Sequence, residues 1–258
     1  MSLITHTIEG ALVTVVINNP SKMNAVSLEG WSELGRLLRA LSADKSLRCV
    51  ILRGAGKLAF SAGADISEFL RVRANAAQAE SYGAVVAEGL AALRECIHPT
   101  LAAIQGVCTG GGMEIACGCD LRIANSSARF GVPINKLGHA FAYAEMQTVL
   151  SSTDRKLVLE LILEGRIVNA DEAFRRGLLN RVVADTAFET EINTTVGRIV
   201  EGAPLVNRAA KKFLARLDDP MPLSEEEIAE GYALCNSRDY AEGVRAFLAK
   251  EKPVFRGE

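Results

Sequence analysis

A glycine-rich turn that ends in an acidic residue is the first feature of the sequence that could do chemistry. The run Thr109-Gly-Gly-Gly-Met-Glu114 follows an apolar stretch and opens a short helical pattern. Three glycines leave backbone N–H groups unshielded, and a helix start directs further N–H groups the same way, which suits a phosphate or a developing oxyanion. A carboxylate would repel a phosphate, whereas Glu114 beside a polarised carbonyl can act as an acid or base. The same residues also fit a plain turn with Glu114 as an exposed first-turn acid.

Two other small-residue segments could bring backbone close to a ligand. In Phe60-Ser-Ala-Gly-Ala-Asp65 the small side chains allow close approach, and Asp65 is predicted to cap the helix that follows. The run Gly54-Ala-Gly-Lys-Leu-Ala59 formally matches a dinucleotide-binding pattern, which leaves nucleotide binding as an alternative function. That pattern requires the turn to open directly into a helix, and the residues from Phe60 to Ala64 intervene here.

The hydrophobic pattern predicts the elements that must position these turns. Apolar and β-branched runs predict strands at residues 11–17, 49–52, 100–104, 121–124 and 177–183. An apolar face predicts a helix from Ser27, its N-cap, to Leu41, and residues 66–95 are predicted to be mostly helical with a break near 71–79.

The pattern changes towards the C-terminus. No strand is predicted between residues 186 and 250, and the runs Ser224-x-x-Glu227 and Asp239-x-x-Glu242 are typical of helix starts. We therefore predict an α/β part over residues 1–195, followed by a helical region over residues 196–258.

Composition narrows the function classes. The 258 residues carry a formal net charge of −2, and 5 % are aromatic, which disfavours a nucleic-acid binder and a membrane-surface binder. The six cysteines lack the spacing of a zinc site, so no metal is predicted. The sequence starts without a signal-peptide pattern and has no apolar run of membrane-spanning length, so a cytoplasmic protein with reduced thiols is expected.

Several spaced motifs, taken together, resemble the crotonase superfamily, the enoyl-CoA hydratase/isomerase family. In chain order they are Asn18-Asn-Pro20 with Asn24-Ala25, Phe60-Ser-Ala-Gly-Ala-Asp-Ile66, Ile104-Gln-Gly-Val-Cys-Thr-Gly-Gly-Gly-Met-Glu114, Cys119-Asp-Leu-Arg122, Phe130-Gly-Val-Pro133, Ala173 to Val183, and Glu242-Gly-Val-Arg-Ala-Phe247 with Lys252-Pro253.

The resemblance implies a fold, a substrate and an assembly. The fold would be a spiral of ββα units with a C-terminal helical region that forms a homotrimer, often paired into a homohexamer. The substrate would be an acyl-CoA thioester, with coenzyme A entering as part of it and no separate cofactor.

The resemblance also implies roles for particular residues. The backbone N–H groups of Ala64 and Gly111 would form the oxyanion hole on the thioester carbonyl, and Glu114 falls on the first catalytic glutamate of the hydratases. Three further residues would lie near coenzyme A, namely Ser61 and Ala62 near the adenine and Lys22 near the phosphates.

One departure from the family pattern bears on the reaction. Hydratases carry a second glutamate where this chain has Ile134. Hydration needs a base for water and an acid for the α-carbon, and isoleucine supplies neither. Candidate replacements lie just beyond Ile134 in the sequence, namely Asn135, His139, Tyr143 and Glu145, of which Glu145 is the first choice.

Four functions that involve an acyl-CoA thioester therefore stay open on the sequence, beside the nucleotide-binding alternative named above. They are hydration that relies on Glu114 with another proton source, one-base double-bond isomerisation, acyl-CoA decarboxylation, and non-catalytic acyl-CoA binding.

Overall fold

The strands of the α/β part form two separate sheets. The computed structural model describes residues 2–258. Six strands form the larger sheet, in the order β1 (Ile4–Glu9), β2 (Leu12–Ile17), β3 (Cys49–Gly54), β5 (Thr100–Ile104), β7 (Leu121–Asn125) and β10 (Arg181–Val183). Four short strands form the second sheet, in the order β4 (Ala59–Ser61), β6 (Val107–Thr109), β8 (Arg129–Gly131) and β9 (Ile167–Asn169). In the larger sheet, the pairing from β2 to β10 is parallel, and β1 and β2 form an antiparallel hairpin.

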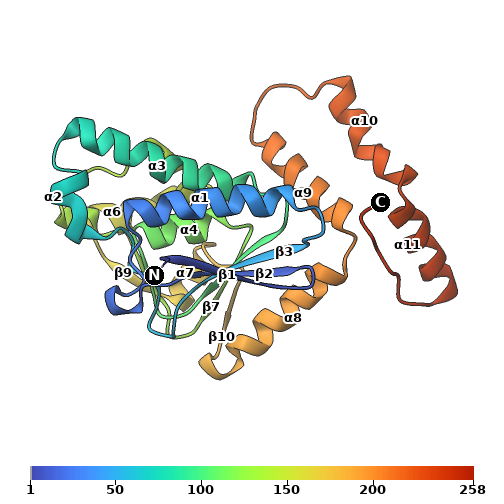
Figure 1. Cartoon of the computed structure of the whole chain (residues 1–258), viewed down its shortest axis with the longest axis horizontal. Coiled ribbons are helices and arrows are strands. Elements are labelled where there is room, and N and C mark those ends of the chain that lie inside the picture. The colour runs from blue at the N-terminus through green and yellow to red at the C-terminus, as the bar shows by residue number, and fades with distance from the viewer. Residues whose placement is uncertain (1) are drawn as a thin grey trace.

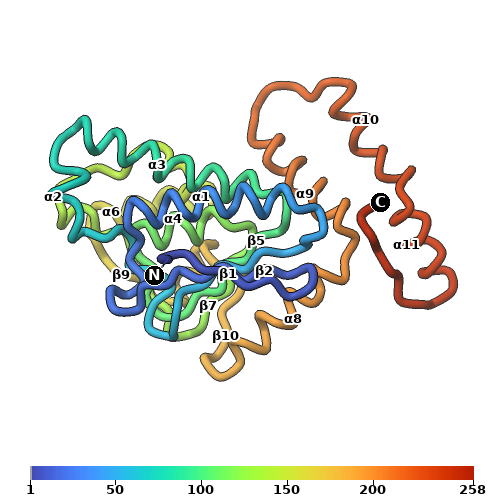
Figure 2. Tube along the Cα trace, in the orientation of Figure 1, coloured from blue at the N-terminus to red at the C-terminus, as the bar shows by residue number. Residues whose placement is uncertain are grey.

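Successive strands alternate between the two sheets, and this alternation produces the spiral. β3, β5 and β7 lie in the larger sheet, and each is followed by a strand of the smaller one. Helices then return the chain, namely α2 (Phe69–Val72) and α3 (Ala76–Arg94), α4 (Gly111–Gly118), and α5 (Tyr143–Leu150) with α6 (Arg155–Leu163). The expected spiral of ββα units is confirmed (Figures 1 and 2).

Helices cover both faces of the larger sheet at its centre, where β5 is buried along its whole length and β3 along its first four residues. Alternate residues of β3 point to opposite sides: Val50 and Leu52 join the main core, whereas Cys49 and Ile51 join a second core. The main core lies under α1 (Leu28–Ala43) and α3, and the second lies under α8 (Phe188–Glu201). Between β9 and β10 the chain forms the short helix α7 (Ala170–Arg175).

Local sequence signals place several helix starts correctly. Ser27 accepts a hydrogen bond from the Gly30 N–H at 3.1 Å, and Asp65 accepts one from the Ser67 N–H at 3.1 Å. The helix start expected at Asp239 is wrong by two residues, because Ser237 is the N-cap of α11 (Arg238–Ala249). Asp239 is instead buried, and its carboxylate accepts hydrogen bonds from the N–H groups of Arg256 and Gly257.

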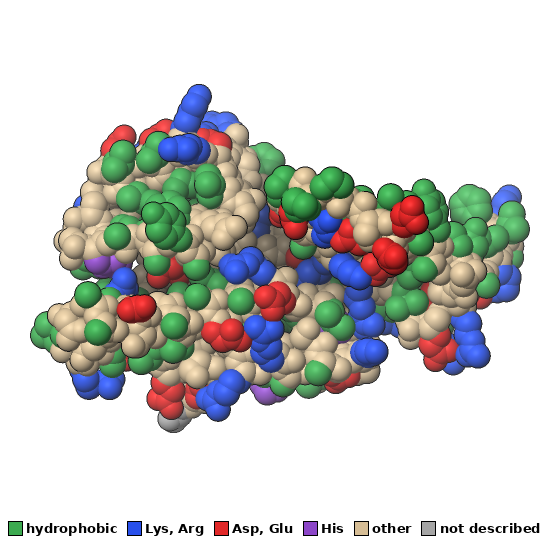
Figure 3. Space-filling model, turned by 90° about the horizontal axis from the view of Figure 1, so that it is seen from above, with side chains coloured by type: hydrophobic (Ala, Val, Ile, Leu, Met, Phe, Trp, Pro, Cys, Tyr) green, Lys and Arg blue, Asp and Glu red, His purple; other side chains and the backbone are tan. Residues whose placement is uncertain are grey.

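The C-terminal helices form an arm that extends from the α/β part (Figure 1). The arm consists of α9 (Pro204–Leu217), α10 (Glu225–Ala233) and α11. The expected boundary at residue 195 lies inside α8, whose Ile192 and Val196 pack on the larger sheet, so we place the start of the arm after Glu201. Hydrophobic side chains gather over the arm in Figure 3. On α11, Phe247 and Leu248 have 83 % and 77 % of their surface exposed.

Candidate active site

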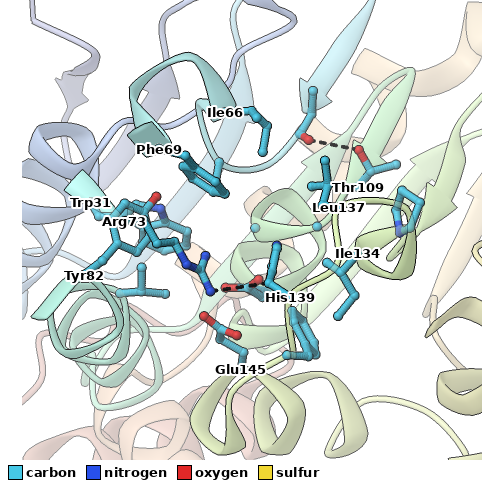
Figure 4. A pocket seen from close by; sticks show the side chains of 18 residues that line it. Trp31, Ile66, Phe69, Arg73, Tyr82, Thr109, Ile134, Leu137, His139 and Glu145 are labelled. Atoms are coloured by element: carbon cyan, nitrogen blue, oxygen red, sulfur yellow. Dashed lines mark hydrogen bonds between the residues drawn. The ribbon is translucent and has the colours of Figure 1, made fainter. Parts of the chain in front are cut away.

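The two glycine-rich segments meet at a cavity of about 130 Å³. Most of its wall is apolar, from Trp31, Ile66, Phe69, Tyr82, Ile134 and Phe141. Four side chains that can carry charge also line it, namely Arg73, Glu114, His139 and Glu145 (Figure 4). Residues 2–258 hold no group of three or more His, Cys, Asp or Glu side chains that could bind a metal ion. No helix in this range is long and apolar enough to span a membrane.

Two backbone N–H groups in the cavity wall have no partner. Gly111 begins α4, so its N–H has no acceptor within the helix. Ala64 follows β4, and neighbouring amides of its loop are bonded to other backbone groups. Within residues 2–258 neither the Ala64 N–H nor the Gly111 N–H donates a hydrogen bond. The Ala64 and Gly111 amides, which the family resemblance implied as a pair, therefore both line the cavity, and both N–H donors are free.

Glycine at two positions makes this approach possible. Gly63 has φ +101°, and a Cβ on it would lie 2.8 Å from the Thr109 carbonyl oxygen and 3.0 Å from the Gly111 nitrogen. A Cβ on Gly112 would lie only 2.3 Å from the Ser61 carbonyl oxygen. Glycine therefore lets the turn after β4 touch the start of α4, and this contact sets the spacing of the two free amides.

Glu114 lies one turn into α4 and faces the cavity. It is 5 % exposed, so it is not the exposed first-turn acid of the plain-turn interpretation. Burial raises the pKa of Glu114 well above its ordinary value of 4.5, and the charge of Glu145 raises it further, whereas Arg73 opposes both effects. The raised pKa keeps this carboxyl group protonated to a higher pH than an ordinary glutamate, and a protonated carboxyl group can donate a proton to a carbon atom.

The raised pKa of Glu114 predicts a pH-dependent stability difference. Between pH 4.5 and the pKa of Glu114 in the folded protein, the folded protein keeps this proton whereas the unfolded chain has lost it. The stability that this group contributes is therefore fully present below pH 4.5 and is lost as pH rises towards the folded pKa. Glutamine cannot ionise, so the Tm of Glu114→Gln relative to that of wild type should increase as pH rises from about 5 to about 8. Each kcal/mol by which ionisation of Glu114 destabilises wild type should widen this Tm difference by about 2–4 °C. Thermal unfolding across this range checks it, and a pH-independent difference would contradict it.

Glu145 and His139 are the two proposed replacements that reach the cavity beside Ile134. Glu145 is 6 % exposed, and its Oε2 accepts a hydrogen bond of 2.6 Å from the Ala142 N–H at the start of α5. Asn135 and Tyr143 do not line the cavity: the Asn135 amide donates to the Leu163 carbonyl, and Tyr143 is 96 % exposed.

Arg73 is a cavity residue that the sequence reasoning missed. It ends α2, inside the break that was expected near residues 71–79, and points towards Glu145 and His139 in Figure 4. Its Nη2 lies 3.4 Å from the His139 Nδ1. The polar run Arg71-Val-Arg-Ala-Asn75 between two apolar helices was the available signal, but a break does not tell which side chain turns inward.

The three residues expected near coenzyme A differ in how far their side chains are exposed to solvent. Ala62 is exposed and lines the cavity mouth. Lys22 is half exposed, and its Nζ donates to the Asp65 carboxylate at 2.7 Å and to the Ser67 hydroxyl at 2.8 Å. Ser61 is fully buried, and its hydroxyl holds the turn by donating to the Asn24 carbonyl and accepting from the Gly63 N–H. The Ser61 side chain therefore has no surface to offer a ligand.

Comparison with known proteins decides the family. The model of the enoyl-CoA hydratase/isomerase family matches residues 7–258. The chain belongs to this family. It is 31 % identical to the short-chain-enoyl-CoA hydratase of Clostridium acetobutylicum, over 95 % of this chain and 94 % of that protein. It is 33 % identical to the crotonyl-CoA hydratase of Syntrophomonas wolfei, over 96 % and 95 % of the two chains.

Solved structures agree with this assignment. An enoyl-CoA hydratase/carnithine racemase from Magnetospirillum magneticum is 49 % identical and superposes with a TM-score of 0.98, over 100 % of this chain and 97 % of that one. An enoyl-CoA hydratase from Bacillus anthracis is 28 % identical with a TM-score of 0.92. The family resemblance expected from the sequence is confirmed, and the enoyl-CoA hydratase/isomerase family makes this chain an acyl-CoA-processing enzyme of lyase or isomerase type.

The dinucleotide alternative finds no support in the fold. The turn from Gly54 to Ala59 joins β3 to β4, so no helix N-terminus stands behind it. The phosphate site of that motif requires such a helix.

Proposed function

We propose that the enzyme adds water to, or removes it from, the α,β position of an acyl-CoA thioester, with Glu114 and Glu145 as the two proton-transfer groups. One observation carries this proposal: two carboxyl groups from different helices line the same small cavity as the two free amides of Ala64 and Gly111. Glu145 thereby offers the second acid or base that Ile134 cannot.

The proposed chemistry assigns one task to each group. The Ala64 and Gly111 N–H groups would donate to the thioester oxygen and stabilise the enolate that forms when the β-carbon is attacked. Glu145 would accept a proton from the attacking water, since its Oε1 makes no hydrogen bond within residues 2–258. Glu114 would give its proton to the α-carbon, so that the elements of water are added across the double bond.

A second candidate is double-bond isomerisation by Glu114 alone. The apolar Ile134 in the cavity wall favours it, because a one-base reaction has no need for a group at that position. Glu114 would then move one proton between the α- and γ-carbons of the thioester. Decarboxylation, the third sequence-based alternative, has no observation of its own in the site.

Glu145→Gln separates the two candidates. Glutamine keeps an oxygen that can accept from the Ala142 N–H, so the start of α5 is preserved. Hydration of crotonyl-CoA, followed by mass spectrometry, is expected to fall by about 10²-fold or more, whereas isomerisation of a 3-enoyl-CoA is retained. Unchanged hydration would show that Glu145 only caps α5. Asn135→Asp, outside the cavity, is the control.

The proposal includes a coenzyme A path and an assembly. Ala62 lines the cavity and would lie near the adenine of coenzyme A. The Lys22 ammonium, which is half exposed and pairs with Asp65, would meet the coenzyme A phosphates once it leaves Asp65. The exposed apolar side chains of α9, α10 and α11 support contact between protomers, as a trimer or a pair of trimers in the cytoplasm.

A further inference from the structure

We propose that the acyl group of the substrate carries its own carboxylate and that Arg73 binds it. This inference rests on the proposed function, because it names the class of thioester that the same cavity accepts. The substrate would be a short dicarboxylic acid joined to coenzyme A at one end. The other end would meet the Arg73 guanidinium.

Arg73 differs from its neighbours in lacking an acidic partner. Arg71, two residues earlier, is exposed and lies 3.5 Å from the Glu68 carboxylate. Arg73 turns into the cavity, and no carboxylate of residues 2–258 lies within 4.0 Å of its guanidinium. A cation beside apolar walls is costly unless an anion approaches it. A substrate carboxylate would fill that position.

Two aromatic rings hold the guanidinium in place. Its carbon lies 5.1 Å from the centre of the Phe69 ring and 5.3 Å from that of the Tyr82 ring. Such contacts orient an arginine without occupying its N–H donors. In the part of the chain that the structure describes, only Nη2 has a side-chain neighbour at hydrogen-bond distance, the His139 Nδ1 at 3.4 Å, so the remaining N–H groups can donate to a carboxylate. The Tyr82 hydroxyl is buried and has no hydrogen-bond partner within residues 2–258.

The other charges of the cavity must be weighed against this assignment. Glu114 and Glu145 line the same space, and Arg73 could instead serve as their counter-ion. Neither carboxylate is within ion-pair distance of Arg73, although both belong to side chains long enough to reach further into the cavity. The cavity of about 130 Å³ is small, which favours a short acyl chain.

A matched pair of saturated thioesters tests the inference without turnover. Glutaryl-CoA and pentanoyl-CoA have equally long acyl chains and differ in a terminal carboxylate against a methyl group. Calorimetric titration of wild type is expected to give at least about tenfold tighter binding of glutaryl-CoA. Arg73→Met should remove this preference without weakening pentanoyl-CoA binding, and Arg73→Lys should restore part of it. Arg71→Met, which alters the neighbouring exposed arginine, should leave the preference intact.

Each other outcome has a definite meaning. Equal affinities in wild type, or equal weakening of both thioesters by Arg73→Met, would overturn the inference and make Arg73 a support for Glu114 and Glu145. Wild-type turnover of crotonyl-CoA without discrimination between the two saturated thioesters would overturn this inference alone. A wild-type protein that binds neither thioester would overturn the proposed function as well.

Discussion

Glu114→Gln is expected to lower enoyl-thioester turnover by about 10²–10⁴-fold while leaving thioester binding close to wild type. The reason is that Glu114 is the buried carboxyl group next to both free amides, and glutamine matches its shape but cannot donate a proton to carbon. Turnover measured by mass spectrometry, together with the Kd for a saturated acyl-CoA, checks both parts.

The same measurement separates an enzyme from a member of the fold that only binds acyl-CoA. Undiminished turnover in Glu114→Gln would remove Glu114 from the reaction, and absent turnover in wild type across hydration, isomerisation and decarboxylation substrates would favour binding alone. Glu29→Gln is the matched control, since Glu29 is also a first-turn acid of a helix but is exposed on α1.

Gly112→Ala is expected to reduce the free energy of unfolding by about 3 kcal/mol, and Tm by about 6–12 °C. The added Cβ would lie 2.3 Å from the Ser61 carbonyl oxygen and 2.9 Å from the Ser61 Cβ, so α4 would have to move away from β4. Thermal and urea unfolding measure the loss.

Gly83→Ala is the control for this substitution. Gly83 lies in α3, and a Cβ there would meet no atom within 4 Å, so alanine should stabilise the helix by about 0.5–1 kcal/mol. A Gly112→Ala protein as stable as wild type would show that the start of α4 is not fixed against β4, and the close spacing of the two amides would then lose its structural basis.

Local patterns made part of this molecule predictable. The caps at Ser27 and Asp65 depend on residues two or three positions apart, and the strand runs at β2, β3 and β5 depend on apolar side chains alone. The spiral was predicted only through the family resemblance. Local patterns could not predict it, because the pairing of β4 with β6 and of β3 with β5 joins segments more than 40 residues apart.

The parts that could not be predicted depend on the direction in which a side chain points. The end of α2 determines whether Arg71 or Arg73 enters the cavity. The sequence predicted a helix cap at Asp239, because its bonds to Arg256 and Gly257 form only when the end of the chain folds back on α11. Ser61 shows the converse, since its place beside the site was expected but its burial was not. Each of these depends on contacts between distant segments.

The oxyanion donors that we propose for this site are peptide groups, and this has a consequence for how the protein can change by mutation. A nucleotide substitution that exchanges Ala64 or Gly111 for another residue replaces a side chain but keeps the N–H, unless the new codon specifies proline. As long as glycine at positions 63 and 112 keeps the two amides in place, the proposed carbonyl-polarising part of the site is inherited with the backbone. The side chains at positions 73, 134 and 145 can be exchanged without changing it. Descendants of this protein could therefore change their reaction or their substrate repeatedly while they keep the same proposed enolate-binding amides.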